Sequence, residues 1–382
     1  MNGSGQSILL DEPREVDVVS IERELTGLWK RASDDDTHEA SPVVRACSMN
    51  LIVFTEDESR ADDISSMVGD VTLEHPSRIF LITADRRSAS PYLDTWISAR
   101  CSIPVPGGKQ VCCEQINLTA NGTEAKKIPS IVTSLLVPDV PTVLLWKTGV
   151  DAKDHVFSSL IEVSDRVLID SSEDQNPEAA LLVWGRMMKG PRNRAAFCDL
   201  AWTHLTRWRS VLARTFQPPE MLGALPAISS VTVDFSTTRA PSHSGLSQSF
   251  LLIGWLTHAL RWSQVYTLRR TETGTYEAKL RFEQQAISVR IGPGSARATG
   301  AGGIESIEID MASGARVIVR TDGREDAISV MRHWPDRPDE EETISLHMEH
   351  EPELVSRELE VVQRDSVYEE SVAKLTSLLM ET

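Results

Sequence analysis

The chain has 382 residues, of which 41% are hydrophobic, and its formal net charge is −17. This length exceeds what one hydrophobic core usually serves, so two main domains are expected. The acidic balance argues against nucleic acid as a partner, because binding phosphates requires clustered Lys and Arg.

The N-terminus shows no signal-peptide pattern, and no apolar run is long enough to span a bilayer. Five cysteines are spread thinly along the chain, unlike the framework of a disulfide-rich secreted protein. We therefore expect a soluble cytoplasmic protein that binds neither membrane nor nucleic acid. Residues 1–40 are expected to form a polar segment with one amphipathic helix over Val16–Arg31.

Residues 41–217 are expected to form an α/β domain, because buried strands alternate with helices. The predicted strands are Val43–Phe54, Arg78–Thr83, Val140–Trp146 and Arg166–Asp170. The predicted helices are Asp63–Val68, Lys127–Leu136, Phe157–Val163 and Ala179–Met188. This alternation is typical of a Rossmann-like, mainly parallel sheet.

A hairpin interrupts the alternation, since Thr95–Ile103 and Lys109–Ala120 flank the turn-forming residues 104–108. If the turn centres on Pro106 and Gly107, Cys101 lies opposite Cys112 on the neighbouring strand. The two cysteines could then form a redox pair. The alternative is that both are small buried apolar residues, which is the commoner role of cysteine in a reducing compartment.

A ligand crevice is expected beyond the carboxyl ends of the parallel strands. Trp146 and Lys147 follow one strand there, and Asp170 and Ser171 follow the next. These four residues are therefore candidates for lining the crevice. Asp170 and Ser171 have an alternative role, because both residue types cap helices and form turns.

The stretch from Cys198 to Phe216 predicts a helix with Trp at 202 and 208 and apolar residues at helical spacing. Trp and Arg are also the residue types that concentrate binding energy at interfaces. We expect both Trp side chains to pack in the core and regard Arg207 and Arg209 as candidate contacts to a partner. Gln217-Pro218-Pro219 ends this helix and marks the expected domain boundary.

Residues 218–345 are expected to form an α+β domain in which an antiparallel sheet packs on a buried helix over Ser249–Trp262. Its predicted strands are Val231–Phe235, Val265–Arg269, Tyr276–Phe282, Ala286–Ile291, Ile304–Met311, Arg316–Arg320 and Ala327–Met331. Residues 346–382 are expected to form an acidic C-terminal segment with a helix over Ser366–Leu379.

The chain lacks the common motifs of nucleophilic, zinc and dinucleotide sites, including Gly-x-Ser-x-Gly, His-Glu-x-x-His and Gly-x-Gly-x-x-Gly. No catalytic residue, metal ligand or cofactor is assigned. Two functions remain open: a non-enzymatic binding protein, or an enzyme or binding protein that takes sugar phosphates or nucleotides in the crevice.

An ordered series of short motifs resembles the glucose-6-phosphate dehydrogenase assembly protein family, OpcA, from Val43 to Met331. In the first predicted domain the motifs are His75-Pro76-Ser77-Arg78, Gln110-Val111-Cys112-Cys113-Glu114, Pro138-Asp139-Val140-Pro141, Leu145-Trp146, Asp165-Arg166, Asp170-Ser171, Asp199-Leu200-Ala201-Trp202 and Trp208-Arg209. In the second they are Gly254-Trp255-Leu256 and Arg261-Trp262.

The resemblance implies a protein that is not an enzyme, binds glucose-6-phosphate dehydrogenase as an assembly factor or allosteric activator, and supports the oxidative pentose phosphate pathway. The cyanobacterial members are linked to redox control, but this chain has no cysteine after Cys198, so a switch built on C-terminal cysteines could not operate. The family tends to have two adjacent Trp residues at positions 145 and 146 of this sequence, whereas this chain has Leu145 followed by Trp146.

Overall fold

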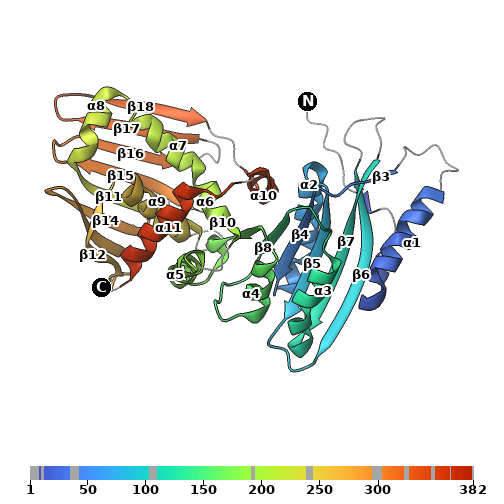
Figure 1. Cartoon of the computed structure of the whole chain (residues 1–382). Helices are drawn as coiled ribbons and strands as arrows, with labels where there is room; N and C mark the ends of the chain where they lie inside the picture. The colour runs from blue at the N-terminus through green and yellow to red at the C-terminus, as the bar shows by residue number, and fades with distance from the viewer. Residues whose placement is uncertain are drawn as a thin grey trace. The chain divides into compact units, whose positions relative to one another are not determined.

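The chain folds into two compact units, and each contains one large sheet (Figure 1). The computed structural model describes residues 8–9, 13–34, 43–102, 110–190, 194–237, 244–294, 303–321, 327–345, 349–361 and 363–380. Unit 1 comprises residues 1–169, 192–198 and 350–364, and unit 2 comprises residues 170–191, 199–349 and 365–382. Both sheets mix parallel and antiparallel pairs and carry helices, so the expected α/β class is confirmed.

The core of the unit 1 sheet has the strand order β7-β5-β4-β8-β9-β10. These strands are β4 (Met49–Thr55), β5 (Ser77–Asp85), β7 (Gln110–Asn121), β8 (Thr142–Trp146), β9 (Arg166–Ile169) and β10 (Ala196–Asp199). The strands from β7 through β9 pair in parallel. Every residue of β4 is buried, as a strand covered on both faces of a parallel sheet requires. The order reverses between β4 and β8, which is where open α/β sheets bind ligands.

Antiparallel strands extend this sheet beyond β7. β6 (Tyr92–Ser102) pairs with β7, and β1 (Ile8–Leu9) and β2 (Arg14–Glu15) pair with β6, while β3 (Val43–Arg45) pairs parallel with β7. Cys101 lies opposite Cys112 in the β6–β7 register, so the expected hairpin register is confirmed. The expected turn at 104–108 lies outside the described residues.

The helices of unit 1 bury apolar stripes. They are α1 (Ile21–Asp34), α2 (Ala61–Glu74), α3 (Ile128–Leu135), α4 (His155–Glu162) and α10 (Glu351–Glu360). α2 follows β4 and buries Ile64, Met67, Val68 and Val71, and α10 packs beside α2. The C-terminal part of the chain therefore supplies one of the helices of unit 1.

Unit 2 is built on an eight-stranded sheet with the order β12-β13-β14-β11-β15-β16-β17-β18. The strands are β11 (Ile228–Phe235), β12 (Ser263–Arg270), β13 (Tyr276–Phe282), β14 (Gln285–Pro293), β15 (Ile304–Met311), β16 (Arg316–Thr321), β17 (Ala327–Trp334) and β18 (Arg337–Ser345). Burial alternates along β11 and β15, as expected for a sheet with one covered face. β11 pairs parallel with β14, so the sheet is not purely antiparallel as expected.

The helices of unit 2 are α5 (Pro177–Met188), α6 (Leu200–His204), α7 (Thr206–Thr215), α8 (Pro219–Ala224), α9 (Ser244–Ala259) and α11 (Ser366–Leu379). Phe250, Leu251, Leu252 and Ile253 of α9 are fully buried, which confirms the expected central helix. α9 packs against α11 and against β11 and β15. α11 has the bounds expected for the C-terminal helix.

The units differ from the expected division at residue 217. α6 contacts α9, and α5 contacts α11, so residues 170–191 and 199–217 pack into unit 2 and not into the unit that contains β4. The predicted single helix over Cys198–Phe216 is wrong in detail, because the chain continues β10 to Asp199 and then forms α6 and α7. Two further elements were not predicted: β18, which lies at the end of the expected α+β domain, and α10, which lies in the expected acidic segment.

Candidate functional site

Four polar side chains meet where three unit 1 strands end. Glu56 follows β4, Arg86 follows β5, Thr148 follows β8, and Asp154 caps α4. Arg86 pairs with both Glu56 and Asp154, and Thr148 Oγ1 donates to Glu56 Oε2 over 3.0 Å. The carboxyl end of the sheet is therefore cross-linked by the protein's own charged groups.

The Arg86 guanidinium also lies over two aromatic rings, at 5.5 Å from the centroids of both Phe54 and Trp146. Such cation–π contacts add to the ion pairs in a partly buried site. Burial raises the pKa of Glu56, but the hydrogen bond and charge of Arg86 outweigh this, so the pKa lies below its ordinary value. Glu56 thus stays ionised and holds Arg86 in place.

Trp146 and Lys147 lie at this carboxyl end, as expected from the sequence, but they line no open space. Trp146 is 1% exposed, and its ring stacks on Phe54 with centroids 4.1 Å apart. The Lys147 side chain is 0% exposed, and its Nζ lies 2.5 Å from Glu351 Oε1 of α10. Both candidates are therefore engaged inside unit 1.

The carboxyl end of β4 is a poor place for a phosphate. Glu56, Asp57 and Glu58 stand between β4 and α2, and Asp57 caps the turn that leads into the helix. Helix N-termini bind phosphate through exposed backbone N–H groups and usually a glycine-rich turn. Three carboxylates at this position repel an anion, so the geometry does not favour a dinucleotide.

Asp170 and Ser171, the other two crevice candidates, belong to unit 2. Asp170 Oδ1 accepts from the backbone N–H of Ser172 over 3.0 Å, which is the capping role left open by the sequence. Ser171 is 2% exposed, and its backbone N–H donates to Asp199 Oδ1 over 3.1 Å. The structure therefore joins these residues to Asp199 at the start of α6.

Asp199 is 0% exposed, and its Oδ1 also accepts from Ala201 N–H over 3.0 Å. Its Oδ2 makes no hydrogen bond. Burial, and then the neighbouring charge of Asp170, raise the pKa of Asp199 to about 7, although the bonds from Ser171 and Ala201 oppose this rise. Asp199 is thus a buried acid that titrates near neutrality.

Arg207 and Arg209, the candidate partner contacts, lie on α7, are half-buried and contact side chains of the preceding helix α6. The Arg209 guanidinium lies 3.5 Å from the Trp202 ring centroid, and Arg207 Nη2 lies 3.2 Å from His204 Nε2. Burial, followed by the charge of Arg207, lowers the pKa of His204 to about 4, so this imidazole is neutral at pH 7. Trp202 and Trp208 are 2% and 4% exposed, as expected for core residues.

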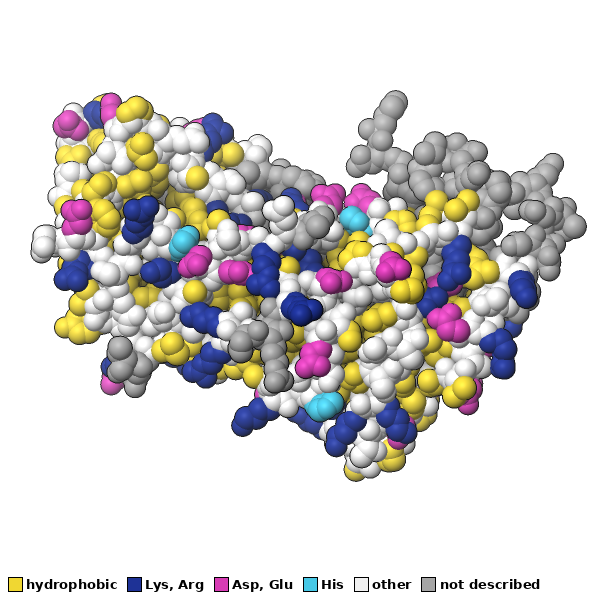
Figure 2. Space-filling view, viewed as in Figure 1, with side chains coloured by type: hydrophobic (Ala, Val, Ile, Leu, Met, Phe, Trp, Pro, Cys, Tyr) yellow, Lys and Arg dark blue, Asp and Glu magenta, His cyan; other side chains and the backbone are white. Residues whose placement is uncertain are grey.

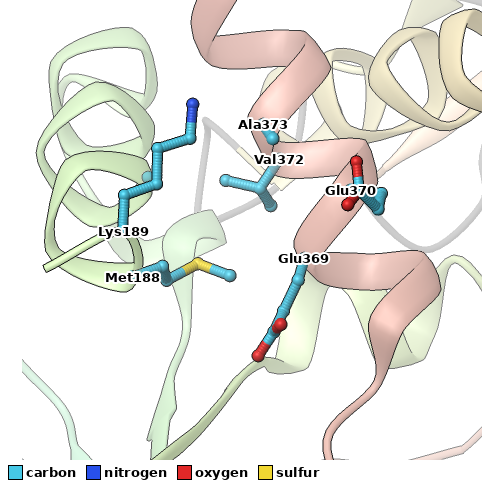
Figure 3. Close-up of a pocket in the computed structure, with 7 residues that line it drawn as sticks. Met188, Lys189, Glu369, Glu370, Val372 and Ala373 are labelled. Carbon is cyan, nitrogen blue, oxygen red and sulfur yellow. The ribbon is translucent and has the colours of Figure 1, made fainter. Parts of the chain in front are cut away.

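A small pocket lies between α5 and α11 (Figure 3). Met188 and Val372 face each other across it, Lys189 stands on the α5 side, and Glu369 and Glu370 stand on the α11 side. Its volume is about 170 Å³. Sites for drug-sized ligands occupy roughly 300–1,000 Å³, so a nucleotide would not fit this pocket.

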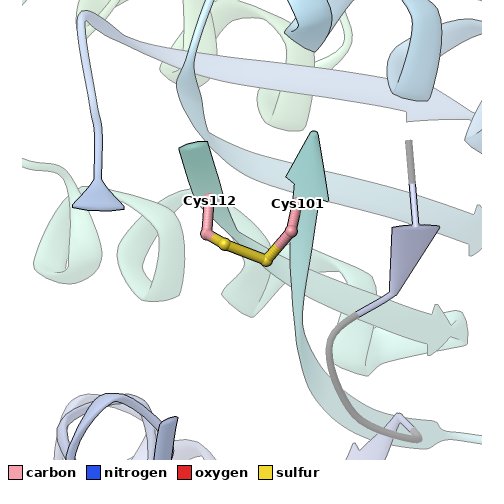
Figure 4. The surroundings of a disulfide bond; sticks show 2 residues. All are labelled: Cys101 and Cys112. Atoms are coloured by element: carbon pink, nitrogen blue, oxygen red, sulfur yellow. A yellow bond between two sulfur atoms is a disulfide. The ribbon is translucent and has the colours of Figure 1, made fainter. Parts of the chain in front are cut away.

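Cys101 and Cys112 form a disulfide between β6 and β7 (Figure 4). Their exposed fractions are 1% and 0%. Thiol–disulfide exchange requires a thiolate to reach a sulfur atom, so burial restricts exchange. Of the remaining cysteines, Cys113 is buried, and burial raises its pKa to about 11, which keeps it protonated.

Within the described ranges, no group of three or more His, Cys, Asp or Glu side chains is arranged to hold a metal ion. None of the helices in the described part of the chain is long and apolar enough to cross a membrane. On the face shown in Figure 2, basic and acidic side chains are interspersed, and no continuous basic patch is visible.

Sequence reasoning missed Arg86, Glu56 and Asp154. The local signals were the acidic run after β4 and the pair Arg86-Arg87 directly after β5. Neither signal shows that the three loops converge, because their contacts join residues about 30 to 100 positions apart.

Two family models match the chain. The model described as glucose-6-phosphate dehydrogenase subunit N-terminal domain matches residues 68–186, and the C-terminal domain of the same subunit matches residues 195–372.

Curated relatives are provisionally named OxPP cycle protein OpcA. The Synechocystis sp. protein is 29% identical over 174 residues, covering 45% of this chain and 34% of the relative. The Nostoc punctiforme protein is 27% identical over 212 residues, covering 54% and 42%. The Synechococcus elongatus protein is 25% identical over 229 residues, covering 59% and 48%. The matched region thus spans between about a third and a half of each relative.

Among solved structures, the dehydrogenase MviM of Clostridium difficile is 8% identical, with 86% of this chain and 97% of that chain covered and a TM-score of 0.38. The WlbA dehydrogenase of Thermus thermophilus is 11% identical, with 72% and 84% covered and a TM-score of 0.38. Similarity at this level carries no argument about activity. The two family models, which together span most of residues 68–372, show that the chain belongs to the glucose-6-phosphate dehydrogenase assembly protein family, OpcA.

Proposed function

We propose that this chain is a non-catalytic cytoplasmic protein that binds glucose-6-phosphate dehydrogenase, promotes its assembly or activation, and so supports the oxidative pentose phosphate pathway. Family membership supports the choice of partner. The non-catalytic role is supported by the carboxyl end of the unit 1 sheet, where Arg86 is paired with Glu56 and Asp154.

We also infer that unit 1 is a Rossmann-like domain. Numbered along the chain, its strands β4, β5, β7, β8, β9 and β10 have the spatial order 3-2-1-4-5-6, which is that of dinucleotide-binding sheets. The ligand position of such a sheet lies between β4 and β8. Here that position holds charged side chains of the protein, which favours a binding protein over the alternative of a nucleotide or sugar-phosphate site.

The proposed mechanism is a population shift. A protein that binds one conformation or oligomer of the dehydrogenase more tightly than another raises the population of that state. The size of the effect is limited by the difference between the two affinities. Stimulation of the dehydrogenase should therefore be largest when sugar phosphate is limiting, and it should saturate as the amount of this chain is increased.

The deciding experiment is a pull-down with the cognate dehydrogenase, followed by its activity at limiting glucose 6-phosphate with increasing amounts of this chain. We expect co-purification and saturable stimulation. In parallel, thermal melting of this chain alone with NADP or glucose 6-phosphate should show no shift. A melting shift without any effect on the dehydrogenase would support the alternative instead.

Arg207 and Arg209 remain our proposed partner contacts. Arg207→Gln and Arg209→Gln should each weaken binding of the dehydrogenase about tenfold, which corresponds to roughly 1.4 kcal/mol. The matched control is Arg214→Gln on the same helix, because Arg214 is exposed and paired with Glu342. Equal effects of all three substitutions would rule out a specific contact at Arg207 and Arg209.

The redox role of Cys101 and Cys112 also remains a proposal. The buried disulfide favours a structural cross-link between β6 and β7 over a rapidly exchanging switch. Stimulation measured before and after treatment with dithiothreitol, with free thiols counted in both samples, separates these roles. A change in stimulation that follows the release of two thiols would favour the switch.

A further inference from the structure

The helix α10 interrupts unit 2. Residues 350–364 belong to unit 1, whereas the chain before and after them belongs to unit 2. Unit 1 thus receives this helix from a distant part of the chain, with about 150 residues between Cys198 and His350. What holds α10 in unit 1 must therefore be found in its side chains.

Four residues of α10 form one stripe: Glu351, Leu354, Val355 and Glu358, at positions i, i+3, i+4 and i+7. Leu354, Val355 and Glu358 are buried, and the Glu351 side chain is 36% exposed. This spacing is the pattern by which an amphipathic helix docks on a receiving surface. Here each end of an apolar centre carries a carboxylate.

Unit 1 provides a buried cation for each carboxylate. Lys147 Nζ lies 2.5 Å from Glu351 Oε1, and Arg166 Nη2 lies 2.5 Å from Glu358 Oε2. The side chains of Lys147 and Arg166 are 0% and 8% exposed. Arg166 Nη1 also donates to the carbonyls of Val361 and Gln363, so it holds the end of the segment as well.

The spacings agree. Trp146 pairs with Ile169, so Lys147 and Arg166 are offset by four residues along neighbouring strands, or about 13 Å. Glu351 and Glu358 are seven residues apart on a helix, or about 10.5 Å, and their side chains can bridge the remainder. α10 therefore runs from the carboxyl end of β8 towards the amino end of β9, beside α2.

We infer that unit 1 has a docking face for an acidic amphipathic helix, formed by Lys147, Arg166 and the side of α2 that contacts α10. The ligand class is a helix of the pattern Glu-x-x-Leu-Val-x-x-Glu, and residues 350–364 occupy the face in the intact chain. A peptide of this pattern in trans competes with α10 for the face. The inference does not depend on the identity of the dehydrogenase as partner.

The test uses the full chain with Glu351→Gln and Glu358→Gln together, which weakens α10 without changing the docking face. The matched control is Glu360→Gln, the same change at an exposed position of α10. Hydrogen exchange should be at least tenfold faster in residues 351–360 of the double variant than in the control. Unchanged protection of α11 and β15 shows that unit 2 remains folded.

A fluorescent peptide of residues 349–365 is then added to each protein. We expect this peptide to bind the double variant saturably and to bind the wild type and the control at least tenfold more weakly. A scrambled peptide should bind none of the three proteins. Equal binding to all three proteins, or no binding to a double variant whose α10 exchanges rapidly, overturns the inference. If α10 exchanges no faster in the double variant than in the control, the ion pairs do not hold it, and the inference also fails. If the double variant does not fold, the single variant Glu351→Gln is measured in the same way.

Discussion

Two consecutive helices near the C-terminus, α10 and α11, are held in different ways. α11 buries Tyr368, Val372, Leu375, Leu378 and Leu379, whereas the apolar side chains that α10 buries are Leu354 and Val355. α11 is fixed by close apolar packing in unit 2, and α10 by ion pairs to two buried cations in unit 1.

Close packing of α11 depends on two glycines. A Cβ at Gly254 would lie 2.5 Å from Ser371 O, and a Cβ at Gly185 would lie 2.2 Å from Thr376 Oγ1. Trp184 Nε1 also donates to Tyr368 Oη over 2.7 Å. α11 therefore cannot leave without disrupting the core of unit 2, whereas α10 can separate from unit 1 at a smaller cost in free energy.

The largest effect is expected for Gly254→Val. The nearest neighbours of the new side chain are backbone and Leu375 Cβ, which cannot move away easily, so overpacking should cost about 3 kcal/mol. Chemical denaturation should show the loss in unit 2. The control is Gly223→Ala in α8, where no atom lies within 4 Å of the new Cβ and helix propensity favours Ala by up to about 1 kcal/mol. Equal stability of the two variants would contradict the assignment of α11 to the core.

A smaller effect is expected for Glu358→Gln alone. The substitution leaves the buried Arg166 guanidinium without its carboxylate, although two backbone carbonyls still accept from it, so we expect a loss of about 2 kcal/mol. Hydrogen exchange should place the loss in α10 and at the amino end of β9. A loss confined to unit 2 would contradict the proposed attachment.

The sequence predicts well those elements whose apolar pattern is regular. Tyr276–Phe282, Ile304–Met311 and Ser366–Leu379 have the same bounds in the structure as in the prediction. Each has a clear period of two or 3.6 residues and ends at polar or turn-forming residues. Trp146 and Lys147 were likewise placed correctly at a strand end, because a buried run stops there.

The failures have physical causes that a local pattern cannot show. β18 is exposed along most of its length, so it lacks the alternation that predicts a strand. The Cys198–Phe216 stretch carries apolar residues at helical spacing from end to end, which hides the change from β10 to α6 at Asp199. The membership of α10 in unit 1 depends on Lys147 and Arg166, about 200 residues away.

Acidification should distinguish the two units further through Asp199 in unit 2. The folded-state pKa of about 7 lies above the ordinary value of 3.8, so the folded unit binds this proton more tightly than the unfolded chain does. This contribution therefore stabilises unit 2 as pH falls from about 7 to about 4, by at most about 1.4 kcal/mol per pH unit. Asp199→Asn should remove the dependence, as measured by denaturation at pH 5 and pH 7. If the unfolding free energy of unit 2 changes by the same amount in the wild type and the variant between pH 7 and pH 5, Asp199 does not titrate there.

The smallest effect on global stability is expected for Lys147→Met, at about 0.5 kcal/mol. Glu351 is 36% exposed and can be hydrated once its partner is gone, and Met fills the volume of the buried lysine stem. The same substitution should nevertheless speed hydrogen exchange at the N-terminal turn of α10, because Lys147 holds that end. Glu358→Gln should instead speed exchange mainly at the C-terminal end of the helix. If both variants opened the whole of α10 equally, the helix would be released as one unit, and its two ion pairs would act together and not as separate anchors.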